Sequence, residues 1–153
     1  FVGSQSARDA EIAIRVSLLL SVVLGTIICT SIVLAKYQIV SLFTNDLSVI
    51  HLAVSVIKIL GINQLYDSIN VIAAGCLRGQ GRQKIGSNLN IACYYMIAVP
   101  LALYLAFVKD LKLVGLWIGL GTGIFTLAIS ETYFVLKSNW QEILSESMKR
   151  NIE

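Results

Sequence analysis

Three long stretches of this sequence contain no charged residue, and they limit the folds open to the chain more than any other feature. Val16–Ala35 has 20 residues, Ile85–Val108 has 24 and Leu113–Ser130 has 18. A helix needs about 20 residues to cross a hydrocarbon core about 30 Å thick. Each stretch is therefore long enough for a membrane-spanning helix, the last one with help from Thr132–Leu136.

A fourth span is expected around residues 50–76, although His51, Lys58 and Asp67 interrupt its apolar character. A crossing there keeps the charged loops on both sides in water. The composition agrees, because 56% of the residues are hydrophobic and only 14% are charged, against about 25% in soluble domains. We therefore predict an all-α membrane protein whose four transmembrane helices lie at about residues 16–35, 50–76, 87–108 and 115–136.

The distribution of basic residues predicts how these helices are oriented. Loops on the cytoplasmic side carry an excess of Lys and Arg. One predicted side holds Arg8, Arg15, Arg78, Arg82, Lys84, Lys137, Lys149 and Arg150, and the other holds Lys36, Lys109 and Lys112. Both chain ends are therefore predicted to be cytoplasmic, in a plasma membrane or a vacuolar-type membrane.

The two ends of the chain are predicted to flank a transmembrane region at residues 16–136. Residues 1–15 are interpreted as an amphipathic cytoplasmic lead-in, with a plain connector as the alternative, and residues 137–153 as a cytoplasmic tail. The chain starts at Phe1 without an initiator Met or a basic region before an apolar stretch. We expect no cleaved signal peptide, and we expect this chain to be a segment of a longer protein.

Several function classes are not expected. The net charge is +3, yet the basic residues gather at span ends rather than on one face, so we expect no nucleic-acid partner. Cys29, Cys76 and Cys93 have spacings unlike zinc or redox motifs and are interpreted as packing residues. Because no Ser/His/Asp, Cys/His or metal-ligand pattern occurs in the sequence, we expect neither an enzyme nor a metal or cofactor.

Asp67 is the acidic residue inside the predicted second span. A charge at membrane depth costs at least about 2.5–3.5 kcal/mol on insertion scales, so it is rarely there without a reason. Helix positions three and four apart are neighbours, which predicts one polar face of Asn63, Gln64, Asp67 and Asn70. Such a face suits a water-filled cavity, where a carboxylate can bind a proton or a sodium ion. The alternative is a structural Asp67 that hydrogen-bonds to neighbouring helices.

The third and fourth spans carry further candidates. Tyr94 is a candidate for contact with an organic cation through its ring, with plain packing as the alternative. Pro100 should kink the third span, because proline removes a helical hydrogen bond. Gly115, Gly119 and Gly123 recur every four residues and predict a stripe for close helix packing. For Glu131 we favour a side chain that reaches toward the membrane surface or pairs with a basic neighbour over ion coupling.

A basic, glycine-punctuated turn joins the second and third spans. Its basic part, Arg78–Lys84, is predicted to contact anionic headgroups or the last carbonyls of the preceding helix. A nucleotide-binding loop is not expected, because the glycines lack the order of a P-loop.

Several blocks of the sequence resemble the C-terminal half of eukaryotic, fungal-like multidrug and toxic compound extrusion (MATE) transporters. They are Gln64-Leu65-Tyr66-Asp67, the run from Gly75 to Gly86, Asn90 with Tyr94-Tyr95 and Pro100-Leu101, Gly115-Leu116-Trp117-Ile118-Gly119, and Leu42-Phe43-Thr44-Asn45-Asp46. The most specific block is Leu-Arg-Gly-x-Gly-x-Gln-Lys-x-Gly, which contributes Arg78, Gly79, Gly81, Gln83, Lys84 and Gly86.

The resemblance implies that the spans are helices nine to twelve of a twelve-helix protein built from two six-helix lobes. It implies that Asp67 takes the place of an acidic residue, often Glu, that relatives use in the tenth helix for cation coupling and substrate binding. The family's other important acidic positions lie in the seventh and eighth helices, outside this chain. Leu127 stands where several relatives carry Gln, and Glu131 has no role in the family pattern.

The predicted function is that of a secondary active antiporter, of which this chain is a fragment. It would export organic cations or other xenobiotics in exchange for protons, or else sodium ions, with Asp67, Asn63, Gln64, Asn70 and Tyr94 as its site. Its partners would be the lipid bilayer, the small-molecule substrate and the remaining helices of the transporter. Two rivals stay open: a four-helix membrane interaction module without transport of its own, and an inactive truncated product.

Overall fold

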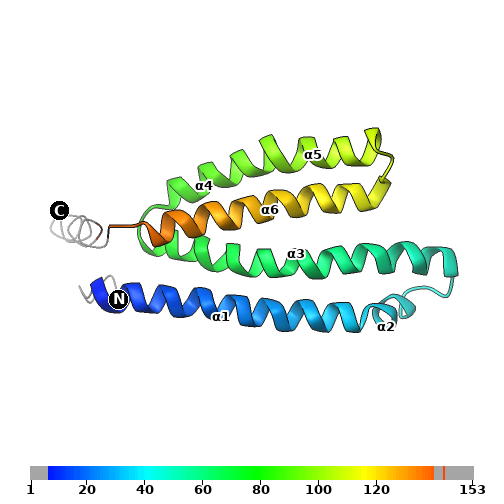
Figure 1. Ribbon diagram of the computed structural model, residues 1–153, viewed down its shortest axis with the longest axis horizontal. Coiled ribbons are helices and arrows are strands. Elements are labelled where there is room, and N and C mark those ends of the chain that lie inside the picture. The colour runs from blue at the N-terminus through cyan, green and yellow to red at the C-terminus, as the bar shows by residue number, and fades with distance from the viewer. Residues whose placement is uncertain (1–6, 140–142, 144–153) are drawn as a thin grey trace.

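The computed structural model describes residues 7–139 and 143, and within them the chain forms a bundle of long helices (Figure 1). Four helical segments are long and apolar enough to cross a membrane: Arg8–Leu34, Leu47–Gly79, Gln83–Val108 and Lys112–Leu136. Many large apolar side chains point outward, among them Leu19, Met96 and Phe107, which are 68–77% exposed. An apolar exterior of this kind is what a lipid-facing bundle presents.

The first two spans form a hairpin. Helix α1 (Ala7–Leu34) is followed by the short helix α2 (Lys36–Ser41) and then by α3 (Leu47–Gly79). Asp46 caps α3, since its Oδ1 accepts a hydrogen bond from the backbone N–H of Ser48 at 2.8 Å. Small residues bring α1 and α3 together: Gly25 lies against Ser68, and Gly61 lies against Val33.

The third span is one uninterrupted helical segment in which the helix type changes along the chain. It runs through α4 (Gln83–Ala92), the π-helical segment η1 (Cys93–Ala98), α5 (Val99–Leu103) and a second π-helical segment, η2 (Tyr104–Val108). Pro100 lies in the first turn of α5, where its missing N–H disturbs the hydrogen-bond ladder. The ribbon slopes through α4 and levels out toward α5, as expected for a span that changes direction near its proline (Figure 1).

The fourth span, α6 (Lys112–Leu136), lies between α3 and the third span (Figure 1). The order across the bundle is therefore α1, α3, α6 and the third span. A small apolar cluster of Ala73, Leu77 and Val135 fixes α3 against α6 near the loop that joins α3 to α4. We call this side of the bundle the loop end.

The predicted fold class, an all-α membrane protein with four transmembrane helices, is confirmed. The helices extend beyond the predicted spans; α3, for example, has 33 residues where 27 were predicted at 50–76. The described part of the predicted lead-in, residues 7–15, continues directly into α1, so a separate interfacial position for it stays a prediction. Of the predicted tail at 137–153, only residues 137–139 and 143 are described.

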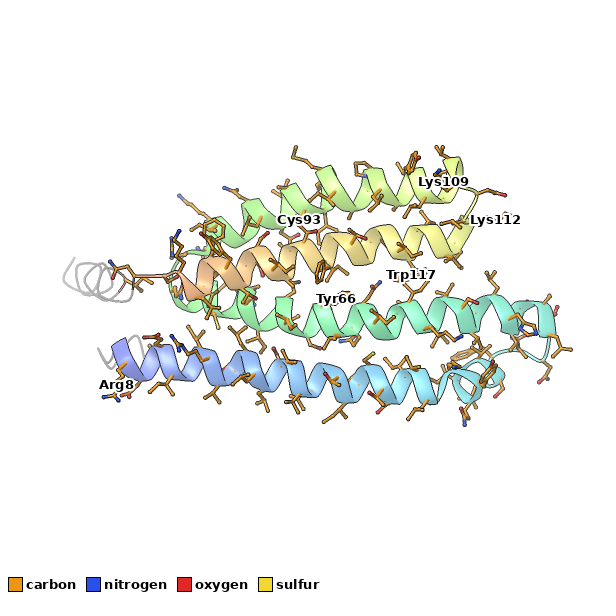
Figure 2. The ribbon with its side chains drawn as sticks, viewed as in Figure 1. Arg8, Tyr66, Cys93, Lys109, Lys112 and Trp117 are labelled. Atoms are coloured by element: carbon orange, nitrogen blue, oxygen red, sulfur yellow. The ribbon has the colours of Figure 1, made fainter. Side chains whose placement is uncertain are left out.

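The two ends of the bundle carry different basic residues. Arg8 lies at one end, while Lys109 and Lys112 lie at the other (Figure 2). The loop end holds Arg78, Arg82 and Lys84, and Figure 1 places it on the side where α1 begins. This is the grouping on which the predicted orientation depends, and the orientation itself stays a prediction.

Candidate functional site

Asp67 lines a pocket of about 340 Å³ between α1 and α3, which we call the Asp67 pocket. Its polar lining consists of Gln64, Asp67 and Ser68 from α3 and Ser17 and Ser21 from α1. The rest of the lining is apolar and includes Leu20, Leu24, Ile28, Val71 and Ile72, so the half-buried carboxylate stands in a mainly apolar pocket with a few polar neighbours. A carboxylate in such a pocket can hold a proton or a small cation.

Tyr94 comes from η1 in the third span, and η1 packs against α6 rather than α3. The side chain of Tyr94 is nonetheless near enough to Asp67 for the two to interact electrostatically. Tyr94 is half-buried, so its ring and hydroxyl are partly accessible. Of the predicted site residues, Gln64 lines the same pocket as Asp67, and Tyr94 does not line it.

Asn63 occupies a different place from the rest of the predicted site. Its side chain is 8% exposed, and its Nδ2 donates a hydrogen bond to the carbonyl of Trp117 at 3.2 Å. It packs against Gly121, where any side chain on α6 would collide with the amide. Tyr66 contacts Phe125 on the same side, with ring centroids 4.8 Å apart, and Figure 2 shows Tyr66 and Trp117 between α3 and α6. Asn63 thus joins two helices rather than facing Asp67.

Asn70 completes the predicted polar face. Its Oδ1 is buried and has no hydrogen-bond partner among the described residues. Spacing along α3 placed Asn63, Gln64, Asp67 and Asn70 on one face, and the structure divides this set. Gln64 and Asp67 line the pocket against α1, while Asn63 lines a separate one against α6.

The predicted glycine stripe on α6 lies directly against the third span. A Cβ on Gly115 would meet the backbone of Leu105 and Ala106 at 2.7–2.9 Å. A Cβ on Gly119 would overlap Ala102, and one on Gly123 would overlap Ala98. We call this contact the glycine seam. Because only glycine lets the two backbones approach so closely, the seam fixes the third span, and with it Tyr94, against the bundle.

The loop motif turns the chain from α3 into α4. Gly81 has φ of 72°, a left-handed conformation that glycine adopts without strain. Lys84 and Arg78 are exposed, and nothing lies within 4 Å of a Cβ on Gly79. The predicted contacts of Arg78 and Lys84 with lipid headgroups stay predictions.

The loop is tied to the end of α6 by one hydroxyl group. Ser138 Oγ accepts a hydrogen bond from Arg82 Nη1 at 3.0 Å. Its own proton can be donated to Gln80 Oε1 at 3.0 Å or to the carbonyl of Phe134 at 2.8 Å. We call this arrangement the Ser138 clasp.

Glu131 lies where the sequence analysis did not expect it. Its side chain is 1% exposed, so it does not reach toward the membrane surface. Among the described residues, no ion pair within 4.0 Å joins Glu131 to a basic neighbour, so the expected pairing is not seen either. The signal was present in the sequence, because Glu131 continues the four-residue spacing of Gly115, Gly119 and Gly123.

Glu131 lines a second polar pocket, of about 390 Å³, which we call the Glu131 pocket. The lining residues are Ala74, Leu77, Arg78, Gln83, Gly86, Ser87, Asn90, Ile91 and Glu131. Gln83, Gly86 and Arg78 of the loop motif therefore meet here. This pocket shares no lining residue with the Asp67 pocket.

The described residues contain no group of three or more His, Cys, Asp or Glu side chains that could hold a metal ion. The polar groups instead form two separate pockets, each with a single carboxylate. Such sites can exchange protons or bind one positive charge. The free thiols of Cys29, Cys76 and Cys93 lie apart from one another, and no disulfide joins them among the described residues.

Comparisons with known proteins agree on one family. A family model described as MatE matches residues 1–104. The uncharacterised transporter YDR338C of Saccharomyces cerevisiae is 39% identical over 95% of this chain, and multidrug and toxin extrusion protein 2 of Homo sapiens is 30% identical over 96%. In structure, the chain is similar to the eukaryotic MATE transporter AtDTX14, with a TM-score of 0.91 and 26% sequence identity over 97% of this chain.

This chain is much shorter than the proteins it matches. It covers 21% of the yeast transporter, 24% of the human protein and 33% of the solved AtDTX14 chain. It therefore spans about a fifth to a quarter of the length of the curated relatives.

Proposed function

Since this chain belongs to the MatE family, we propose that it is part of a secondary active antiporter that exports organic cations or other xenobiotics in exchange for protons. Its relatives include a human protein named for multidrug and toxin extrusion. Secondary transporters move their substrates across the membrane by alternating access and do not change them chemically. We therefore assign no enzymatic activity.

We propose further that the chain supplies four helices of a longer transporter. It covers a third of the solved AtDTX14 chain, which is the share that four of twelve helices would occupy. Within the described residues, Gln64 and Asp67 line a pocket that is enclosed only by α1 and α3. The remaining helices of the transporter would complete the cavity, with both ends of this chain in the cytoplasm.

The observation that supports the proposal is that Asp67, a carboxylate within a candidate membrane span, lines a pocket together with Gln64, Ser68, Ser17 and Ser21. In one state of the cycle the carboxylate holds a proton, and in the other it faces the positive charge of the substrate or a cation. Gln64 offers hydrogen bonds beside it, and Tyr94 offers a ring and a hydroxyl. The protonated carboxyl group is neutral and the ionised one is negative, so a proton and a positively charged substrate cannot both occupy Asp67. Exchange transport requires such mutually exclusive binding.

The experiment is export of a fluorescent organic cation from liposomes that carry the protein encoded by the complete reading frame. Asp67→Asn removes the charge and keeps the shape, so we expect it to abolish transport driven by a pH gradient. Asp46→Asn is the matched control, because it makes the same chemical change at an exposed helix cap. Unchanged transport by Asp67→Asn would reject the proposal.

Asn63 provides a second, sharper comparison within the same helix. Because it joins α3 to α6 and does not line the Asp67 pocket, Asn63→Gln should affect folding yield before it affects coupling to the pH gradient. If Asn63→Gln uncoupled transport as Asp67→Asn does, the site would have to include the α3–α6 interface.

A further inference from the structure

Glu131 is a carboxylate buried in the membrane-spanning part of α6 without a partner for one of its oxygens. Its side chain is among the largest fully buried ones, and its Oε2 has no hydrogen-bond partner among the described residues. An ionised carboxylate in such surroundings loses several kcal/mol of hydration that nothing here restores. The group must therefore be neutral, or it must receive a positive charge from its surroundings.

The Glu131 pocket gives this carboxylate access to water. Its volume of about 390 Å³ is many times the space that a single water needs, which is about 10–15 Å³. Gly86 lines the pocket beside the carboxylate, where an added Cβ would stand in van der Waals contact, 3.5 Å from Glu131 Oε1. Gln83, Ser87 and Asn90 line the pocket with neutral polar groups. Water molecules in this space would have hydrogen-bond partners on several sides.

The charged and titratable groups around Glu131 come from two elements. Arg78 of α3 lines the pocket and interacts electrostatically with Glu131, while its own side chain is exposed. Cys93 of η1 is buried nearby, close enough to interact electrostatically with the carboxylate. Helix α4 contributes only neutral residues to the lining, and α1 contributes none. One cation at the pocket thus faces one carboxylate, without forming an ion pair within 4.0 Å.

We propose that Glu131 is a second proton-binding site, separate from Asp67 and loaded from the aqueous phase at the loop end. When the site is occupied, the carboxyl group is neutral and its burial carries no electrostatic cost. When the O–H bond breaks, the proton passes to water in the pocket, and the guanidinium of Arg78 compensates the carboxylate that remains. Arg78 thereby acts as a positioning residue that makes the deprotonated state accessible.

This inference does not depend on the proposed transport function. The Asp67 pocket and the Glu131 pocket share no lining residue, and Glu131 can exchange a proton whether or not Asp67 does. The rival explanation is a permanently charged Glu131 that Arg78, or a helix beyond this chain, neutralises. The two explanations differ in whether the carboxyl group changes its protonation state with pH.

The experiment is infrared difference spectroscopy of the protein encoded by the complete reading frame, reconstituted in liposomes and titrated from acid to alkaline pH. We expect a band from a protonated carboxyl group that disappears as the pH rises. It should be absent in Glu131→Gln and retained in Asp67→Asn. Glu131→Asp, which keeps a carboxyl group, should show a displaced band, so the assignment survives if Glu131→Gln does not fold.

Two arginine variants test the role of the pocket's cation. Removing the positive charge in Arg78→Gln should let Glu131 keep its proton to a higher pH, because a nearby opposite charge favours the ionised carboxylate. Arg82→Gln is the matched control, because Arg82 lies in the same loop but donates to Ser138 and does not line the pocket. The proposal is overturned if no band depends on Glu131, if that band does not change with pH, or if both arginine variants shift it equally.

Discussion

The glycine seam and the Glu131 pocket occupy one face of one helix and have opposite properties. Gly115, Gly119 and Gly123 recur every four residues along α6, and continuing that spacing leads through Leu127 to Glu131. In the seam, the backbone of the third span rests on the glycines, so no space remains between the helices. At the loop end, the same stripe carries a buried carboxylate beside a cavity of about 390 Å³.

This difference shows how one packing surface can hold a span firmly and still leave room for chemistry. In a membrane, close contact between small residues supplies much of the attraction between helices. The seam provides that contact along η1, α5 and η2. The loop end therefore does not need to be closely packed, and its polar residues can line a cavity. The following predictions break or sharpen this comparison.

The largest effect is expected where a side chain is forced into the seam. Gly119→Leu places a large group against Ala102, so the third span must separate from α6 or distort. We expect a loss of about 3 kcal/mol or more in the free energy of unfolding, at the upper end of overpacking effects. Unfolding in detergent micelles measures it, and Gly79→Ala, with nothing within 4 Å of the new Cβ, is the control. Equal stability of the two variants would mean that the seam does not hold the span.

A smaller effect is expected on the opposite side of α6, where Gly121 accommodates Asn63. Asn63→Ala removes the hydrogen bond to the Trp117 carbonyl and part of the packing against Gly121. Interhelical hydrogen bonds in membranes contribute about 0.6 kcal/mol on average and up to about 1.7, so we expect a loss of about 1–2 kcal/mol with packing included. The free energy of unfolding in detergent micelles, compared between Asn63→Ala and the unchanged protein, measures this loss. A gain in stability would show that the Asn63 bond is not formed in the bilayer.

The Ser138 clasp tests the loop end separately from the seam. Ser138→Ala removes the acceptor of Arg82 Nη1 and the donor to Gln80 Oε1, which should cost about 1 kcal/mol. Hydrogen exchange should rise in the loop after α3 while the seam stays protected. Ser41→Ala, whose hydroxyl bonds only within its own helix turn, is the control. Faster exchange across all of α6 would contradict a local role for the clasp.

The smallest effect is expected at the cap of α3, far from both regions. Hydrogen bonds from the Ser48 hydroxyl and then from the Ser48 backbone N–H lower the pKa of Asp46 below its usual value of 3.8. Because the folded pKa is the lower one, the cap contributes fully above the unfolded value and is lost as the pH falls through the folded value. The amide exchange of Ser48 should therefore accelerate only in acid, below about pH 4. Acceleration near neutral pH would show that the cap is not formed.

Much of the fold could be predicted from the sequence because membrane constraints act locally. Charge-free runs of about 20 residues have few alternatives to a helix in a bilayer, and the spacing of Gly115, Gly119 and Gly123 already indicated a contact stripe. The helix bounds were less predictable, since α3 continues past Cys76 and through the charged Arg78 to Gly79. Hydropathy marks the apolar part of a helix and not its ends.

The candidate site was harder to predict, because spacing gives the direction of a side chain only relative to its own helix. Asn63 and Asp67 are four residues apart, yet α1 and α6 flank α3 on different sides and divide them. Glu131 was assigned a position near the membrane surface because it follows the apolar run closely. It shares a pocket with Leu77 of α3 and with Gly86 and Asn90 of α4, and α4 is brought there by the turn at Gly81.

The central claim is that water reaches the Asp67 pocket and the Glu131 pocket but not the α6 stripe that runs from the glycine seam to Leu127. Reaction with a membrane-impermeant thiol reagent tests it in liposomes, after Cys29, Cys76 and Cys93 are replaced by Ala. Asp67→Cys then reports on the Asp67 pocket, and Ser87→Cys reports on the Glu131 pocket. Leu127→Cys reports on the fully buried stripe of α6. We predict that the cysteines at positions 67 and 87 react and that the cysteine at position 127 does not. Equal reactivity at all three positions, or reaction at position 127 alone, would contradict the account.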